Sequence, residues 1–104
     1  PPLLDMLSLD EEAFKSLFSA SPVKRTGYIR FMRNCLIAAG NASDDKLIPV
    51  VKSYLLHYDP RLRASAVWAL SCYLDRDSLA ALHPSDERDI DVQAEWKTAL
   101  NLAD

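Results

Sequence analysis

Basic side chains without acidic neighbours are the residues of this sequence with the clearest chemistry. Residues 22–34 hold four of them, Lys24, Arg25, Arg30 and Arg33, and no acid, although the whole chain of 104 residues carries a formal net charge of -3. Ammonium and guanidinium groups bind anions, and a guanidinium binds a carboxylate or a phosphate through two parallel hydrogen bonds. The segment therefore predicts a site for an anionic partner.

A helix over residues 22–39 is predicted to position these cations. Ser21 serves as its cap, and a proline takes the first helical position, where its missing N–H is not needed. Arg30, Arg33 and Asn34 are expected on one side of this helix, facing water. The apolar residues recur at spacings of three and four, so they share the opposite face: Tyr28, Ile29, Met32, Cys35, Leu36 and Ala39.

The rest of the chain also predicts helices, because the sequence has only two glycines and its apolar residues recur at helical spacing. The helix that Asp59-Pro60 opens is apolar on nearly every side over residues 62–74, so we expect it at the centre of the core. Residues 1–7 are predicted to be a lead-in without a helix. The other helices are expected over residues 9–19, 44–57, 78–82 and 91–102.

Local signals predict where these helices begin and end. Ser8 and Glu11 have the spacing of a capping box for the helix over residues 9–19. Gly40 and Asn41 are expected to end the helix over residues 22–39 in left-handed backbone. Asp59, which is followed by a proline, is expected to cap the central helix.

Two stretches of the chain repeat one another. Ser-Pro-Val-Lys-Arg-Thr at 21–26 aligns with Asp-Pro-Arg-Leu-Arg-Ala at 59–64, which lies 38 residues later, and a weaker third copy begins at Asp89. Helical units of about 40 residues indicate a solenoid, in which neighbouring units must stack to bury their apolar faces. Residues 47–70, with an apolar-Pro first helix, an Asp-Pro turn and an alanine-rich second helix, resemble a HEAT repeat. The predicted fold is therefore all-α, a HEAT-like solenoid of five to six helices in antiparallel pairs, as one domain over residues 1–104.

A longer resemblance covers the first 41 residues. It consists of Leu3-Leu4, Glu11-Glu12-Ala13-Phe14, the run Ser21 to Tyr28, the run Arg30 to Asn34 and Gly40-Asn41. These residues are similar to the C-terminal domain of the epoxyqueuosine reductases, which complete the modified base queuosine in tRNA. Ala39 is a small departure, since a leucine is expected there.

The resemblance implies a role for the chain. It would be the tRNA-facing, HEAT-like C-terminal part of a longer enzyme and would carry no catalytic residue and no cofactor of its own. The cobalamin and the two [4Fe–4S] clusters of such an enzyme would lie in its N-terminal domains, which would be partners of this part. The absence of an initial methionine also predicts a piece of a longer protein.

Six residues are predicted to contact nucleic acid: Lys24, Arg25, Arg30, Arg33, Asn34 and Arg61. As phosphate ligands they would position the anticodon stem–loop without reading its sequence, and three or four such contacts imply a log–log salt slope of about -2 to -4. Arg25 and Arg63 hold equivalent positions in the repeat. In HEAT stacks that arginine commonly pairs with a helix-cap aspartate, so Asp59 and Asp89 are candidate partners, and for Arg63 we favour this structural role.

Other residues have competing interpretations. Phe31 is the best candidate to stack on an unpaired base, whereas Tyr28 and Trp68 are expected in the core. Cys35 and Cys72 are expected as free, buried thiols. The two histidines are expected at helix ends, and the acidic stretch over residues 86–91 is expected to be a solvated connector.

Two alternatives to RNA binding remain open from the sequence. The first is a HEAT-repeat scaffold that binds another protein through its groove. The second is a small enzyme built on a cysteine and a histidine, which we disfavour because no nucleophile–base–orienting set is visible. The sequence has no apolar run of the roughly 18 residues that a membrane span needs, and we expect a cytoplasmic protein with no membrane partner.

Overall fold

The fold is described by a computed structural model, which covers residues 2–18 and 25–102. In this part of the chain there are seven α-helices, two short 3-10 helices and no strand, which confirms the all-α class. The α-helices are α1 (Leu3–Leu7), α2 (Glu11–Leu17), α3 (Arg25–Asn41), α4 (Ile48–Ser53), α5 (Pro60–Ser71), α6 (Arg76–Ala80) and α7 (Ile90–Leu100). The 3-10 helices are η1 (Asp45–Leu47) and η2 (Tyr54–Leu56), on either side of α4.

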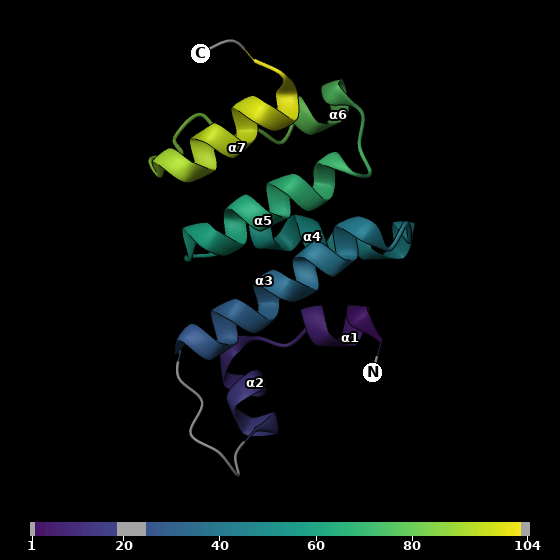
Figure 1. Cartoon of the computed structure of the whole chain (residues 1–104), viewed down its shortest axis with the longest axis vertical. Coiled ribbons are helices and arrows are strands. Elements are labelled where there is room, and N and C mark those ends of the chain that lie inside the picture. The colour runs from purple at the N-terminus through teal and green to yellow at the C-terminus, as the bar shows by residue number, and fades with distance from the viewer. Residues whose placement is uncertain (1, 19–24, 103–104) are drawn as a thin grey trace.

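The three longest helices form a stack. Helices α3, α5 and α7 follow one another along the long axis of a molecule that measures 48 × 29 × 16 Å, and all three begin at the same edge (Figure 1). Each has a shorter companion: α1 packs against α3, α4 against α5 and α6 against α7. The HEAT-like assignment of this arrangement stays a prediction.

Helix α5 lies at the centre of the core, as its sequence predicted. It packs against α3 on one side and α7 on the other (Figure 1). Its residues Leu62, Ala66, Val67, Ala69 and Leu70 are fully buried. The predicted apolar face of α3 is also buried, so the two periodic patterns together account for most of the interior.

The first residues differ from the prediction. Residues 3–7, expected as a lead-in, form helix α1 and bury Leu7 against α3. Ser8 ends α1, and its hydroxyl donates to the carbonyl of Leu4 at 2.7 Å, so it does not open the next helix. Asp10 caps α2 instead by accepting a hydrogen bond from the N–H of Ala13 at 2.7 Å. A carboxylate at this position satisfies a free N–H as well as a serine hydroxyl would.

The end of α3 corrects a second prediction. Gly40 is not in left-handed backbone but inside the helix, and Ser43 has the positive φ, 53°. Gly40 is needed there for space, because a Cβ on it would lie 2.4 Å from Cζ3 of Trp68 in α5. The glycine thus lets α3 and α5 approach closely.

In the described stretches, no helix has both the length and the apolar character to cross a membrane.

Candidate functional site

Helix α3 presents two arginines to solvent. Arg30 and Arg33 are exposed, and so is the neighbouring Asn34. Within residues 2–18 and 25–102, neither arginine forms an ion pair. We call Arg30, Arg33 and Asn34 the basic ridge; its two guanidinium groups have their hydrogen-bond donors available for an anion.

Two predicted ligands cannot be placed. Lys24 lies outside the described residues. Arg25 is the first residue of α3, but its side chain lies outside the described part as well. Their proposed contacts with nucleic acid therefore stay predictions.

Arg61 is held by the cap of its own helix. Its Nε and Nη2 atoms donate to the two carboxylate oxygens of Asp59 at 3.0 and 2.8 Å, and its backbone N–H donates to the same residue at 2.9 Å. The hydrogen bonds from Arg61 hold the pKa of the Asp59 carboxyl below its usual range. The Arg61 side chain remains 56% exposed, so the pair fixes its direction without hiding its charge.

Arg63 has a different partner from the one predicted. It forms a two-pronged pair with Glu87, with N–O distances of 2.9 and 3.0 Å, and donates to the carbonyl of His57 at 2.8 Å. Asp59 and Asp89, its expected partners, instead cap α5 and α7. Arg63 thus has a structural role, as expected. Its acidic partner is Glu87, from the connector before α7, and not a helix-cap aspartate.

The acidic connector is therefore partly built into the fold. Side-chain exposure is 21% for Arg63 and 9% for Glu87. The hydrogen bonds from Arg63 lower the pKa of Glu87. The prediction of a solvated connector was wrong for Glu87 and for Asp89, whose carboxylate accepts from the N–H groups of Asp91 and Val92.

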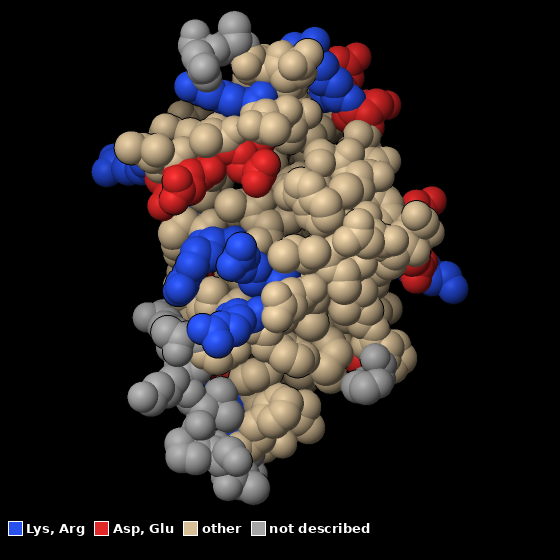
Figure 2. Space-filling model, viewed as in Figure 1, with Lys and Arg blue, Asp and Glu red and all other residues tan. Residues whose placement is uncertain are grey.

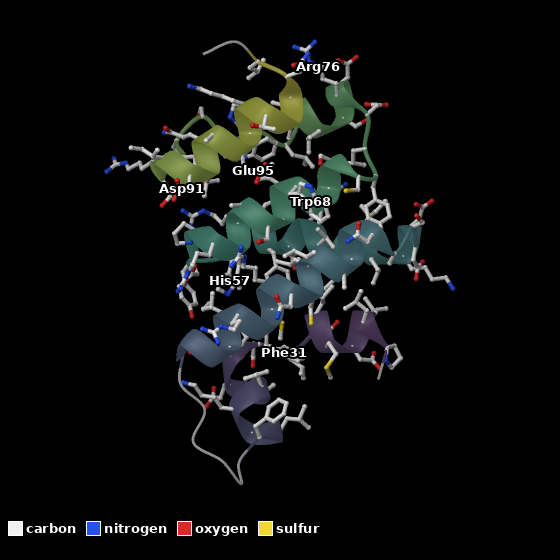
Figure 3. The ribbon with its side chains drawn as sticks, viewed as in Figure 1. Phe31, His57, Trp68, Arg76, Asp91 and Glu95 are labelled. Atoms are coloured by element: carbon white, nitrogen blue, oxygen red, sulfur yellow. The ribbon has the colours of Figure 1, made fainter. Side chains whose placement is uncertain are left out.

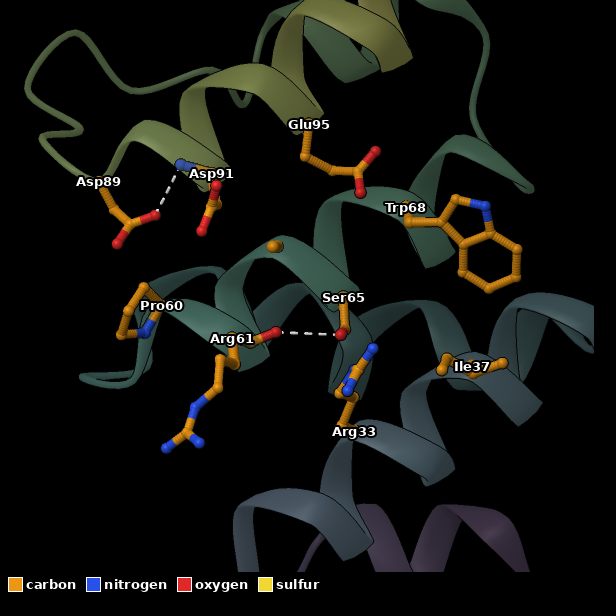
Figure 4. A pocket seen from close by; sticks show the side chains of 10 residues that line it. Arg33, Ile37, Pro60, Arg61, Ser65, Trp68, Asp89, Asp91 and Glu95 are labelled. Carbon is orange, nitrogen blue, oxygen red and sulfur yellow. Dashed lines mark hydrogen bonds between the residues drawn. The ribbon is translucent and has the colours of Figure 1, made fainter. Parts of the chain in front are cut away.

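A groove of about 530 Å³ lies where α3, α5 and α7 meet. Arg33 and Arg61 form one wall, and Asp91 and Glu95 of α7 face them across it (Figure 4). Figure 2 shows the same separation on the surface, with Lys and Arg atoms gathered below a band of Asp and Glu atoms. We call this the α3–α5–α7 groove; its remaining lining residues are Ile37, Pro60, Ala64, Ser65, Trp68 and Asp89.

The acidic wall was not predicted. Asp91 and Glu95 are four residues apart on α7, a spacing that places both on one side of the helix. That signal was in the sequence, but only the packing of α7 on α5 brings them opposite Arg33 and Arg61. Glu95 is half-buried, and burial raises the pKa of its carboxyl.

Trp68 forms one end of the groove and is half-buried, whereas the sequence predicted it in the core. Its ring packs over Gly40, and the exposed Ile37 lies on the adjacent turn of α3. The groove therefore joins an apolar, aromatic end to two charged walls.

Phe31 is packed into the protein more than predicted. It is half-buried, and its ring lies 5.1 Å from that of Phe14 and 6.4 Å from that of Phe18. Tyr28 is buried, as expected.

The cysteines and histidines show no arrangement for metal binding. Both cysteines are free, but only Cys35 is buried, which raises the pKa of its thiol, while Cys72 is exposed just after α5. His57 stacks on Tyr54, and His83 lies 4.8 Å from the ring of Trp96. Among the described residues no three His, Cys, Asp or Glu side chains gather as a metal site, and two cysteines do not fit a [4Fe–4S] cluster, which takes about four thiolates.

Comparison with known proteins supports the resemblance seen in the sequence. The chain is similar to proteins named epoxyqueuosine reductase: it is 33% identical to that of Yersinia pestis over 84 residues and 29% identical to that of Escherichia coli over 76. The aligned residues make up 79% and 73% of this chain but 20% of each relative. The chain thus spans about a fifth of the length of these curated relatives. No protein-family model matches the chain, and no solved structure does.

Proposed function

We propose that this chain is the RNA-contacting, HEAT-like part of a protein of the epoxyqueuosine reductase kind. Such an enzyme would reduce epoxyqueuosine to queuosine at the wobble position of tRNA in the cytoplasm. This part would hold the anticodon stem–loop through the basic ridge, and Lys24, Arg25 and Arg61 would add further phosphate contacts.

One observation carries the proposal. On an acidic chain, Arg30 and Arg33 are exposed and have no ion pair in the described residues. Two unpaired guanidinium groups on one helix match the phosphates of a polyanion, which dominate the affinity of proteins for nucleic acids. The similarity to proteins named epoxyqueuosine reductase supports tRNA as the proposed RNA.

The proposed contacts position the RNA and do not catalyse. Phosphate contacts fix orientation but carry little sequence information. No residue of this chain is assigned to the reduction. Cobalamin and iron–sulfur clusters would be bound by other domains, and the role proposed for this chain does not use them.

The test is equilibrium binding of tRNA to the protein and to the double variant Arg30→Ala/Arg33→Ala. We expect the double variant to bind about tenfold or more weakly, since it lacks two phosphate contacts. The matched control is Arg76→Ala/Lys97→Ala, which removes the same charge from exposed positions on α6 and α7, Arg76 lying at the far end of the molecule (Figure 3). Equal losses in both variants would show a general charge effect and contradict the assignment of the ridge.

A second candidate function is a scaffold that binds a helix or loop of another protein. It is favoured by an apolar groove of about 240 Å³ between η2, α5 and α7, whose lining includes Leu55, Val67 and Trp96. Leu56 at its rim is 91% exposed. If Leu56→Asp abolishes binding to the other domains of the protein and leaves tRNA affinity unchanged, the result supports the scaffold function and assigns it to this groove.

A further inference from the structure

The α3–α5–α7 groove holds three kinds of group that together fit one ligand. Arg33 and Arg61 supply positive charge, Trp68 supplies a planar ring, and Glu95 supplies a carboxylate acceptor. Its volume of about 530 Å³ falls in the range of about 300–1,000 Å³ typical of small-molecule sites.

The cationic end of the groove is suited to a phosphate. Arg33 forms no ion pair among the described residues, and Arg61 is fixed by Asp59 through Nε and one side of Nη2. The remaining donors of Arg61 are free of that pair, and the side chains of Arg33 and Arg61 both line the groove. Because Arg33 belongs to the basic ridge, this end continues the proposed RNA surface.

The aromatic end is suited to a base. Trp68 is half-buried over Gly40, which holds one part of its ring against α3. A ring fixed in this way loses little freedom when a base stacks on it. Unpaired bases commonly stack on such rings in protein–RNA complexes.

Glu95 offers the groove a carboxylate acceptor. Its carboxylate extends from α7 into the groove (Figure 4), is half-buried, and has no hydrogen bond or ion pair within the described residues. Two carboxylate oxygens accept two parallel hydrogen bonds, and guanine alone among the common bases offers two adjacent donors, N1–H and N2–H, on its Watson–Crick edge.

We propose that the groove binds one unpaired guanine nucleotide of the RNA, with its phosphate on Arg33 and Arg61, its base on Trp68 and its Watson–Crick edge on Glu95. The proposal rests on the proposed function, because the nucleotide is taken to be part of the bound RNA. It adds base selectivity to a surface that otherwise contacts phosphates alone.

The test compares guanosine 5′-monophosphate with uridine 5′-monophosphate, and follows the Trp68 indole N–H by NMR titration. We expect the guanine nucleotide to bind about 5- to 100-fold more tightly, the range for one good two-pronged base contact. Glu95→Ala is expected to reduce this ratio to near one.

Asp91→Ala is the matched control, because it removes the same charge from the same wall one turn earlier on α7. It is expected to strengthen the binding of both nucleotides alike and to keep their ratio. Trp68→Leu is expected to weaken both by about 5-fold or more. If Trp68→Leu fails to fold, the ratio of the two nucleotide affinities in Glu95→Ala still tests the proposal.

Equal affinities of the wild type for the two nucleotides, or an equal loss of the ratio in Asp91→Ala, would overturn the inference. So would a Trp68 signal that responds to another domain of the protein and to neither nucleotide, which would make the groove a protein-binding site. If tRNA binding depends on Arg30 while the two nucleotides bind alike, the groove assignment fails and the proposed function stands. If the wild type does not bind tRNA, the proposed function fails, whatever the nucleotide ratio is.

Discussion

The arginines of α3 and α5 have the same side chain in two different settings. Arg30 and Arg33 are exposed and form no ion pair with any residue that the structure describes. The Arg63 side chain is 21% exposed, pairs with Glu87 and donates to the carbonyl of His57, just after η2. The difference shows that an arginine supports the fold where an acid pairs with it and both side chains are largely buried.

The pairing of Arg63 depends on chain segments that are distant in sequence. Glu87 lies 24 residues further on, in the connector that α7 brings back to the start of α5. The basic ridge has no such connector in the described residues. An arginine therefore gains a buried partner of this kind only where the chain brings an acid back to it.

Removing Arg63 should have the largest effect on stability. Arg63→Ala removes the charged partner of the mostly buried Glu87 and leaves its carboxylate the hydrogen bond from the Asp89 N–H, so we expect the free energy of unfolding to fall by about 2–3 kcal/mol. Arg30→Ala, on an exposed surface, should change it by less than about 0.5 kcal/mol. Urea denaturation followed by circular dichroism measures both. Similar losses of stability in the two variants would contradict the structural role assigned to Arg63.

Gly40→Ala tests how the two helices approach each other without changing either set of arginines. In an ordinary helix the change would add about 1 kcal/mol of stability. Here the new Cβ would meet the Trp68 ring, so we expect a net loss of about 1–2 kcal/mol and a changed Trp68 fluorescence. The control is Gly27→Ala, at an exposed position of α3, which should stabilise the protein or leave it unchanged. A stabilised Gly40→Ala variant would show that the Trp68 ring can move away from the new Cβ at little cost.

The pair between Arg63 and Glu87 should also give stability a dependence on pH. The pKa of Glu87 is lower in the folded protein than its usual value of 4.5, so its stabilising effect is complete above that value and is lost as the pH falls through the lowered one. We expect Glu87→Gln to be about 1–2 kcal/mol less stable than the wild type at pH 7, a gap that narrows below pH 4.5. A gap that is constant from pH 7 to pH 3 would exclude the charge of Glu87 as its cause. The pKa of Glu95 is shifted upward, so Glu95 acts in the opposite direction: its contribution falls as the pH rises through its own pKa.

Much of the fold could be predicted because its signals are local. The period of apolar residues identified α3, α5 and α7, and Asp59 with the following proline marked the start of α5. Helix α1 was missed because five residues carry too little of the period, and its stability comes from contacts with α3. The prediction of Gly40 as a helix stop failed for a similar reason, since its role depends on Trp68 in another helix.

The candidate site could be predicted only in part. Exposure of Arg30, Arg33 and Asn34 followed from the helical period of α3 alone. The partner of Arg63, the position of Trp68 at a surface and the acidic wall of the groove all depend on how α7 and its connector pack on α5. No pattern within one helix contains that information.

The salt dependence of tRNA binding tests the central claim most directly. Because each phosphate contact releases counterions, the wild type should show a slope of about -2 to -4 in a plot of log affinity against log salt concentration. Arg30→Ala/Arg33→Ala should make the slope shallower by about 1.5–2, whereas Arg63→Lys, which keeps the charge, should leave it unchanged. An unchanged slope in the double variant would show that the basic ridge does not contact the RNA.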